Sequence, residues 1–420
     1  MIEYQRPSER AYLVGIATRD ERTAAPGLLE ELRALTETLG LETVGRETVY
    51  VRDVSPRYYL GSGKALEIAR RAQDLEADVI VFDEELSPSQ QRNWEALAEC
   101  SVTDRQGIIL EIFAERAQTR EARLQVDLAR YEYLLPRLTS AWSHLSRQRG
   151  GRRGTRGEGE TQLEVDRRII QQRIASIKRD LHDVAGQRAV SRRQRMELPV
   201  PNGSVVGYTN AGKSSLLGAL TGSDVVVADK LFATLDPATR RLELEGGQEI
   251  LLTDTVGFVR RLPHGLVNAF RSTLEETLLA HFLLHVIDAS DAAAVEHARI
   301  TLDVLEEIGS REKPTIQVLS KIDLVDADTL DFARLSFPDA VPVSAVTGEG
   351  LDQLRVEIRR FVTTAFAPIH VAIPHARYDL AALIHRTGRV LEERHVDGTV
   401  NIRAEVPERT RQIVEEYTTA

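Results

Sequence analysis

The sequence has one cysteine, Cys100, among 420 residues, and only 5% of its residues are aromatic. One cysteine cannot form an internal disulfide or a cluster of thiolate metal ligands, so a disulfide-stapled secreted domain is excluded and a reducing compartment is favoured. We expect Cys100 to be a small buried hydrophobe. The sequence has no apolar run that approaches the roughly 20 residues of a membrane span. Its N-terminal residues also lack the basic and then apolar pattern of a signal peptide. The sequence therefore predicts a cytoplasmic protein without a membrane span.

The overall charge is acidic but unevenly distributed. The chain carries a net charge of -10, with 42% hydrophobic and 28% charged residues, which is typical of a soluble globular protein. This charge argues against a protein that coats nucleic acid along its whole surface. Residues 101–198, however, contain 20 Lys and Arg against 13 Asp and Glu. One segment could therefore meet RNA while the rest stays acidic.

The length predicts roughly two to four domains. The first, residues 1–105, alternates strand-like and helical patterns, which indicates a small parallel α/β domain. We read GSGK at 61–64 as a helix start, because it has no first glycine at the spacing of a phosphate loop. Strands are expected at 11–16, 47–51 and 79–83, and helices at 25–39, 63–75 and 87–99.

Residues 106–197 change to long helices with narrow apolar seams. Each seam follows a/d spacing, so the simplest way to bury both is an antiparallel helical hairpin with residues 139–160 at its tip. The tip is rich in glycine and arginine. It is either a solvated loop or, as we favour, a contact for a nucleic-acid phosphate backbone. The seam residues are Phe113, Ala117, Leu124, Leu128, Tyr131, Leu135 and Leu138 in one helix and Leu163, Ile170, Ile174, Ile177, Leu181 and Val184 in the other, and the tip arginines are Arg147, Arg149, Arg152, Arg153 and Arg156.

Two further units complete the chain. The third, residues 198–366, has expected strands at 204–208, 240–245, 249–254, 282–288, 315–320 and 341–345, with helices between most of them. The last, residues 367–420, is read as a small α+β domain: a strand at 371–373, a helix at 379–396, a strand at 399–406 and a helix at 409–417.

The third unit opens with a phosphate-binding motif. GYTNAGKS follows a strand and opens a helix, as G-x-x-x-x-G-K-[ST] requires. Its glycines turn backbone N–H groups toward phosphates, Lys213 reaches the outer phosphates, and the Ser214 hydroxyl binds Mg²⁺. The expected nucleotide-binding residues here are Gly207, Tyr208, Thr209, Asn210, Ala211, Gly212, Lys213 and Ser214.

Two downstream motifs are expected to sense the γ-phosphate. In DTVG, Asp254 ends a strand beside the phosphate loop, and the N–H of Gly257 is free to meet the phosphate. In FATLD, the Thr234 hydroxyl completes the Mg²⁺ shell. We therefore assign catalytic roles to Lys213, Thr234 and Gly257, and metal-ligand roles to Ser214 and Thr234. The two motifs comprise Phe232, Ala233, Thr234, Leu235, Asp236, Asp254, Thr255, Val256 and Gly257.

The stretch VLSKIDLV is one letter from the guanine-reading motif Asn-Lys-x-Asp, with Ser320 at the place of Asn. Asp323 accepts hydrogen bonds from groups that adenine does not present, so guanine preference is expected to survive with weaker affinity. The Ala345 N–H can then contact guanine O6. The base-reading residues are Ser320, Lys321, Ile322, Asp323, Ser344, Ala345 and Val346.

The sequence lacks one side chain that many related GTP-binding switches use for hydrolysis. Phe258 stands where many related switches carry a water-orienting Gln, so intrinsic turnover should be slow and depend on a partner or an ion. Asn210 lies inside the phosphate loop. Its side-chain carbonyl is a candidate ligand for K⁺, and the alternative is a hydrogen bond that braces the loop.

GYTNAGKSSL, ADKLFATLDPATRRL, DTVGFVRRLPHGLVNAFRSTLEE and RGEGETQLEVDRR resemble segments of the HflX family of ribosome-associated GTPases, and the resemblance covers nearly the whole chain. It implies a multidomain α/β fold: an N-terminal α/β domain with a long helical hairpin, a P-loop GTPase domain, and a small C-terminal domain. Ser320 departs from the family's usual Asn, whereas the family also lacks the Gln at Phe258.

The resemblance also implies a function. Family members bind GTP or GDP with Mg²⁺, associate with the large ribosomal subunit and split stalled or idle ribosomes, with the helical loop reaching toward the peptidyl-transferase region. The tip arginines would then meet ribosomal RNA. We expect a monomer that can associate peripherally with ribosomes or a membrane. The alternatives are a GTPase of subunit assembly and a nucleotide-gated RNA-binding scaffold that hardly hydrolyses GTP.

Overall fold

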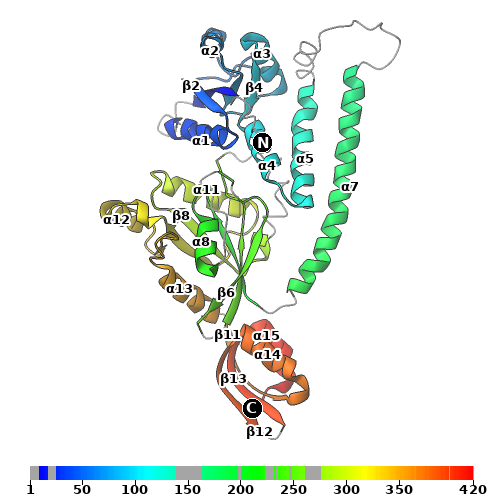
Figure 1. Ribbon diagram of the computed structural model, residues 1–420, viewed down its shortest axis with the longest axis vertical. Helices are drawn as coiled ribbons and strands as arrows, with labels where there is room; N and C mark the ends of the chain where they lie inside the picture. The colour runs from blue at the N-terminus through cyan, green and yellow to red at the C-terminus, as the bar shows by residue number, and fades with distance from the viewer. Residues whose placement is uncertain are drawn as a thin grey trace, which may run out of the picture. The chain divides into compact units, whose positions relative to one another are not determined.

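The computed structural model describes residues 9–17, 25–138, 162–196, 200–222, 231–232, 234–245, 248–260, 276–364, 366–396 and 398–419 (Figure 1). The described residues fall into two compact units, one up to Ala185 and the other from Gly186 onward. Within these ranges, no helix is both long and apolar enough to cross a membrane. The fold is mixed α/β, as expected.

The N-terminal sheet is parallel, with strand order β2-β1-β3-β4. Its elements are β1 (Arg10–Ala17), α1 (Ala25–Thr38), β2 (Glu42–Tyr50), α2 (Ser62–Asp74), β3 (Val79–Phe82), α3 (Pro88–Ala98) and β4 (Ser101–Asp104). The helix start at Ser62 confirms the reading of GSGK. The sequence patterns missed β4, which has only four residues. Cys100 is only partly buried against the core, and this burial raises its pKa to about 11.

The long helices are α4 (Arg105–Arg116), α5 (Arg120–Leu134) and α7 (Gln162–Met196), with a short 3-10 turn at Leu135–Arg137. The first predicted helix is interrupted, because Ala117 is extended and the Thr119 side chain caps α5 by accepting from the Ala122 N–H. α5 and α7 lie side by side, joined by the ion pair Lys178–Glu132 at 2.8 Å (Figure 1). Ile177 of the predicted seam is fully buried. The predicted arginine tip lies outside the described residues.

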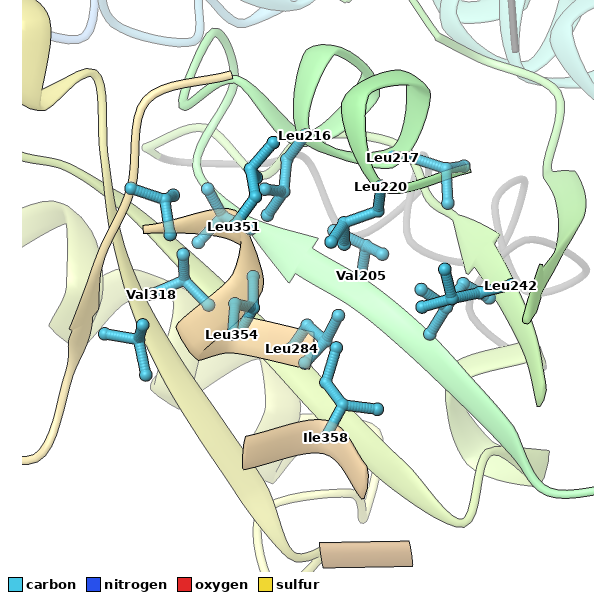
Figure 2. Packing of buried hydrophobic residues seen from close by; sticks show 14 of the residues in the cluster. Val205, Leu216, Leu217, Leu220, Leu242, Leu284, Val318, Leu351, Leu354 and Ile358 are labelled. Carbon is cyan, nitrogen blue, oxygen red and sulfur yellow. The ribbon is translucent and has the colours of Figure 1, made fainter. Parts of the chain in front are cut away.

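The third unit is built on a six-stranded sheet of order β10-β9-β8-β5-β7-β6, parallel except for β6. Leucines of α8 and α13 point toward β5, β8 and β9 and form the core (Figure 2). The bounds are β5 (Asn202–Gly207), α8 (Lys213–Thr221), β6 (Ala238–Leu244), β7 (Gln248–Asp254), β8 (Phe282–Asp288), α11 (Ala294–Glu307), β9 (Thr315–Ser320), a 3-10 turn (Ile322–Leu324), α12 (Ala327–Ser336), β10 (Val341–Pro342) and α13 (Leu351–Thr364).

The strand order explains where a ligand fits. β5 lies between β7 and β8. The chain passes from β5 to β6 and β7 on one side of β5 and then crosses to β8 and β9 on the other side, so the strand order reverses at β5. In open α/β sheets, ligands bind beyond the carboxyl ends of the strands at such a switch point. The phosphate motif follows β5, DTVG follows β7, and the base-reading motif follows β9.

The C-terminal sheet is antiparallel, with order β11-β13-β12. The predicted helix over 379–396 is wrong in its second half: α14 ends at Thr387, and the next residues form β12. Gly388 is extended, and a Cβ there would lie 2.6 Å from Val406 Cγ1, so the chain passes close to β13 as it changes direction. The bounds are β11 (Phe366–Pro374), a 3-10 turn (His375–Arg377), α14 (Tyr378–Thr387), β12 (Arg389–Val396), β13 (Thr399–Pro407), α15 (Glu408–Val414) and a 3-10 turn (Glu415–Tyr417).

Candidate nucleotide-binding site

The phosphate loop joins β5 to α8 and depends on glycine at its start. Gly207 has φ +153°, and a Cβ there would lie 2.3 Å from the carbonyl oxygen of Val286 on β8. Gly212 adopts a left-handed conformation directly before α8. The loop therefore runs close to the sheet and presents the N-terminus of α8, whose N–H groups favour anions. Asn210 is exposed with φ +59°, a conformation that asparagine tolerates.

Lys213 is buried, and its Nζ donates to the carbonyl of Tyr208 at 2.8 Å. Burial lowers the pKa of Lys213 to about 8; Asp254 opposes the shift, and Lys321 adds to it. A cation in this position is stabilised by an anion such as a phosphate. The structure thus places the predicted lysine where its charge needs a partner.

Three oxygen-bearing side chains from different parts of the chain converge beside Lys213. Ser214 Oγ donates to Asp254 Oδ2 at 2.5 Å and lies 2.7 Å from Thr234 Oγ1. Asp254 Oδ1 is buried and has no hydrogen-bond partner among the described residues. Burial raises the pKa of Asp254, while Lys213, Ser214 and Thr234 act against the increase. Hydroxyl and carboxylate oxygens are ligands that suit Mg²⁺, so these residues fit the expected ion.

The other described residues of FATLD mainly pack inside the domain. Phe232 and Leu235 are buried, and the Phe232 N–H donates to Thr209 Oγ1 at 3.1 Å. Asp236 is half-buried, and Ala233 lies outside the described residues. The side chains of Phe232 and Leu235 therefore hold Thr234 in place from within the domain.

The DTVG segment lies tightly against the phosphate loop. The Thr255 hydroxyl donates to the Val205 carbonyl at 2.7 Å, and Val256 is buried. A Cβ on Gly257 would lie 2.6 Å from Thr209 Cα and 2.9 Å from Lys213 Nζ, so only glycine fits. The Phe258 side chain is 1% exposed, so it packs inside the domain.

The base-reading segment is tied to the phosphate loop through Ser320. Its buried Oγ donates to the Ala211 carbonyl at 2.7 Å and lies 3.1 Å from the carbonyl oxygen of Ile287. Lys321 has a left-handed backbone and pairs with Asp288 at 2.8 Å. The structure brings Ile322 into the core and leaves Asp323 exposed.

The second expected base-reading element is a turn after β10. Ser344 is buried, and its Oγ accepts from the N–H groups of Val346 at 3.2 Å and Thr347 at 3.0 Å. This bonding shapes the turn that carries Ala345, whereas the Val346 side chain is exposed.

Sequence reasoning missed residues that support the motifs. Asp288, the partner of Lys321, ends strand β8, and a carboxylate at the end of a buried strand is a signal that could have found it. Arg260, Glu296 and His297 also contact the site's framework. No motif marks these three, because their contacts join segments far apart in the sequence.

A phosphate loop at the switch point of a parallel sheet, with a separate base-reading loop, defines the class of P-loop GTPases. Four family models match the chain in succession. They are described as GTP-binding GTPase N-terminal (residues 27–114), GTP-binding GTPase Middle Region (116–195), 50S ribosome-binding GTPase (202–321) and HflX C-terminal domain (334–416).

The chain belongs to the HflX family of GTPases, and it binds and hydrolyses GTP. It is 46% identical over 412 residues to GTPase HflX of Akkermansia muciniphila, covering 95% of this chain and 94% of that protein. It is 41% identical over 410 residues to GTPase HflX of Escherichia coli strain K12, covering 97% and 96%. A crystal structure of a GTP-binding protein from Sulfolobus solfataricus in complex with GDP is also similar, with 25% identity, 85% and 99% coverage and a TM-score of 0.43.

Proposed function

We propose that this GTPase binds the large ribosomal subunit and uses GTP to dissociate stalled or idle ribosomes. The observation that carries the proposal is the match of residues 202–321 to a 50S ribosome-binding GTPase model, because these residues hold most of the site. The α5–α7 arm, meaning these two helices and the sequence that connects them, supports the proposal. The connecting sequence is rich in arginine, which suits RNA phosphates. Ribosomal RNA is then the partner of Arg147, Arg149, Arg152, Arg153 and Arg156.

Each part of the site has a proposed role in hydrolysis. N–H groups of residues 208–214 and the Lys213 ammonium hold the phosphates, and Gly257 donates its N–H to the γ-phosphate. Ser214 and Thr234 hold Mg²⁺, with Asp254 accepting from Ser214 behind them. When bound, the ion neutralises charge on the β- and γ-phosphates.

Guanine is read by residues 320–323 and 344–346. Asp323 accepts from the base, and the Ala345 N–H donates to O6. Ser320 braces this segment against the phosphate loop through Ala211. The buried Phe258 leaves the attacking water without a side-chain guide, so ribosomes should accelerate hydrolysis.

We also propose that Asn210 ligates a K⁺ ion beside the phosphates. Its exposed position inside the loop supports this role, because a side-chain carbonyl there can point toward a bound nucleotide. Replacing Na⁺ by K⁺ should raise the hydrolysis rate of the isolated protein, and Asn210→Ala should remove the increase. A K⁺ effect that persists in Asn210→Ala would refute this role and leave the ribosome dependence standing.

The test is sedimentation of 70S ribosomes on sucrose gradients after incubation with the protein and GTP, GDP or a non-hydrolysable GTP analogue. We expect the protein to co-migrate with the large subunit and the 70S peak to fall with GTP or the analogue, but not with GDP. Lys213→Ala is the control that keeps the arm and removes the phosphate-binding cation. Binding only to immature particles would favour an assembly role. Ribosome binding without splitting or stimulated hydrolysis would favour the scaffold.

A further inference from the structure

The segment that follows DTVG is fastened to the phosphate loop by two backbone hydrogen bonds. Phe258 N–H donates to the Gly207 carbonyl at 3.1 Å, and Thr209 N–H donates to the Phe258 carbonyl at 2.7 Å. Tyr208 and Phe258 thus form a parallel bridge that extends the pairing of β5 with β7. The phosphate loop and the segment after DTVG are therefore paired like neighbouring strands.

Tyr208 adds a side-chain fastening. Its hydroxyl accepts from the backbone N–H of Arg260 at 2.9 Å. Its ring stacks on His297 of α11, with centroids 3.7 Å apart and planes 6° from parallel. His297 is itself held by Asp291 at 2.5 Å. The phosphate loop is therefore joined through one tyrosine to both Arg260 and α11.

Arg260 is held from the other side by Glu296. The Arg260 guanidinium forms an ion pair with Glu296 in the first turn of α11, and its side chain is only 10% exposed. A charged hydrogen bond at a largely buried guanidinium is stronger than one at the surface, and removing one partner leaves the other without compensation. Residues 258–260 are consequently fixed by Gly207, Thr209, Tyr208 and Glu296 together.

This arrangement bears on the third phosphate. We expect a γ-phosphate to contact both the Gly257 N–H and Lys213, and therefore to lie between them. A Cβ on Gly257 would lie 2.6 Å from Thr209 Cα and 2.9 Å from Lys213 Nζ, so little room is left between these residues. Admitting the γ-phosphate therefore requires the DTVG segment, the end of the Lys213 side chain or both to move. GDP, which ends at the β-phosphate, requires no such movement.

We propose that Glu296 and Tyr208 are positioning residues that set the preference between GDP and GTP. By holding residues 258–260 on the phosphate loop, they oppose the displacement that the γ-phosphate needs and leave GDP binding unaffected. The inference rests on the roles proposed above for Lys213 and Gly257. A partner that pulled α11 or Arg260 away would favour the GTP-bound form without touching the nucleotide.

The test uses two variants that each remove one contact to Arg260 and leave the hydrophobic core intact. Glu296→Gln removes the charge paired with Arg260, and Tyr208→Phe removes the hydroxyl but keeps the ring on His297. Each should tighten binding of a non-hydrolysable GTP analogue by roughly three- to tenfold, the size expected for losing one hydrogen bond or ion pair from the closed arrangement. GDP affinity of the Glu296→Gln variant should stay within about twofold, because Glu296 lies outside the nucleotide-binding residues and its ion pair with Arg260 does not oppose GDP.

The matched control is Glu306→Gln, which breaks the exposed pair with Arg311 at the other end of α11 and should change neither affinity. Affinities are measured by calorimetric titration of the isolated protein, with thermal unfolding of each variant as a check on folding. The proposal is overturned if the analogue-to-GDP affinity ratio stays at the wild-type value in both variants, or if both nucleotides change in parallel. Ribosome splitting is measured separately, so failure here and failure of the ribosome function are distinguishable.

Discussion

At the scale of single residues, Ser320 shows how a shortened motif keeps part of its function. Its hydroxyl replaces the side-chain bond from the base-reading segment to the phosphate loop, at 2.7 Å from the Ala211 carbonyl. A serine is too short to also reach the base. Ser320→Asn should therefore tighten GTP and GDP together by roughly 1–2 kcal/mol, about tenfold, because bonds to the base do not depend on the γ-phosphate.

Fluorescence titration with both nucleotides measures this change. Asp323→Ala is the companion variant, and it should reduce the preference for guanine over adenine rather than shift GTP and GDP equally. If Ser320→Asn binds both nucleotides as the wild type does, then the hydroxyl already supplies all that the position contributes.

The lowered pKa of Lys213 predicts proton uptake on nucleotide binding. With a pKa of about 8 in the folded protein, Lys213 is largely neutral at about pH 8.5, and a bound phosphate restores the charged form. The unfolded chain holds this proton up to the ordinary lysine pKa. The free energy of unfolding therefore decreases as pH falls from the ordinary lysine pKa toward about 8. Nucleotide affinity should accordingly decline as pH rises above about 8.

Calorimetric titration of GDP at about pH 8.5, in two buffers of different ionisation enthalpy, counts the protons taken up. Most of one proton is expected at this pH and almost none at pH 7. Lys213→Arg, which stays protonated, should bind more weakly with no uptake. Equal heats in both buffers for the wild type would show that Lys213 is already charged before the nucleotide binds.

Individual site residues were predictable where a motif fixes their spacing. The motifs selected Ser214, Thr234 and Asp254, which meet within hydrogen-bond distance, because each ends or begins an element at one edge of the sheet. Arg260 and Glu296 were not predictable. Their meeting depends on how α11 packs, and no periodicity records that packing.

At the scale of elements, prediction succeeded where one pattern covered the whole element. Strands such as β8 and β9 were found residue for residue, because short runs rich in Leu, Ile and Val are typical of parallel strands. The helix over 379–396 failed because residues 389–396 carry helix-favouring charges, and their strand conformation depends on pairing with β13. Likewise, the a/d seam runs through Ala117, yet local capping by Thr119 starts a new helix.

The seam of α7 offers a test within one helix. Ile177 is fully buried, whereas Ile169 is 55% exposed. Ile177→Ala should destabilise the packing of α7 by roughly 2–4 kcal/mol, because it removes buried methyl groups and leaves a cavity. Ile169→Ala should change stability by less than about 0.5 kcal/mol, since alanine also favours helix.

Hydrogen exchange followed by mass spectrometry reports the opening of α7 directly. Faster exchange in Ile177→Ala but not in Ile169→Ala is the expected pattern. Similar exchange in both variants would mean that α7 is stabilised by its own helical hydrogen bonds rather than by the seam.

At the scale of the whole molecule, charge and nucleotide chemistry are separated along the chain. The whole chain has a net charge of -10, yet residues 101–198 have an excess of seven positive charges. The nucleotide motifs all lie beyond residue 200. A basic arm can then contact RNA by charge, while the acidic remainder avoids coating it. This separation predicts that ribosome binding and nucleotide binding can be impaired independently.

The arginine-rich segment between α5 and α7 allows that separation to be tested. Changing Arg147, Arg149, Arg152, Arg153 and Arg156 to Ala should leave GTP affinity intact and weaken ribosome binding. Each lost phosphate contact removes a released counterion, so the slope of log affinity against log salt should become shallower by up to about 0.7–0.9 per contact. If the segment also disturbs the mature ribosome, splitting should fail even at concentrations where the variant is fully bound. Filter binding over a series of salt concentrations measures the slope, and a sucrose-gradient assay measures splitting. An unchanged slope together with unchanged splitting would show that these arginines form only a solvated connection.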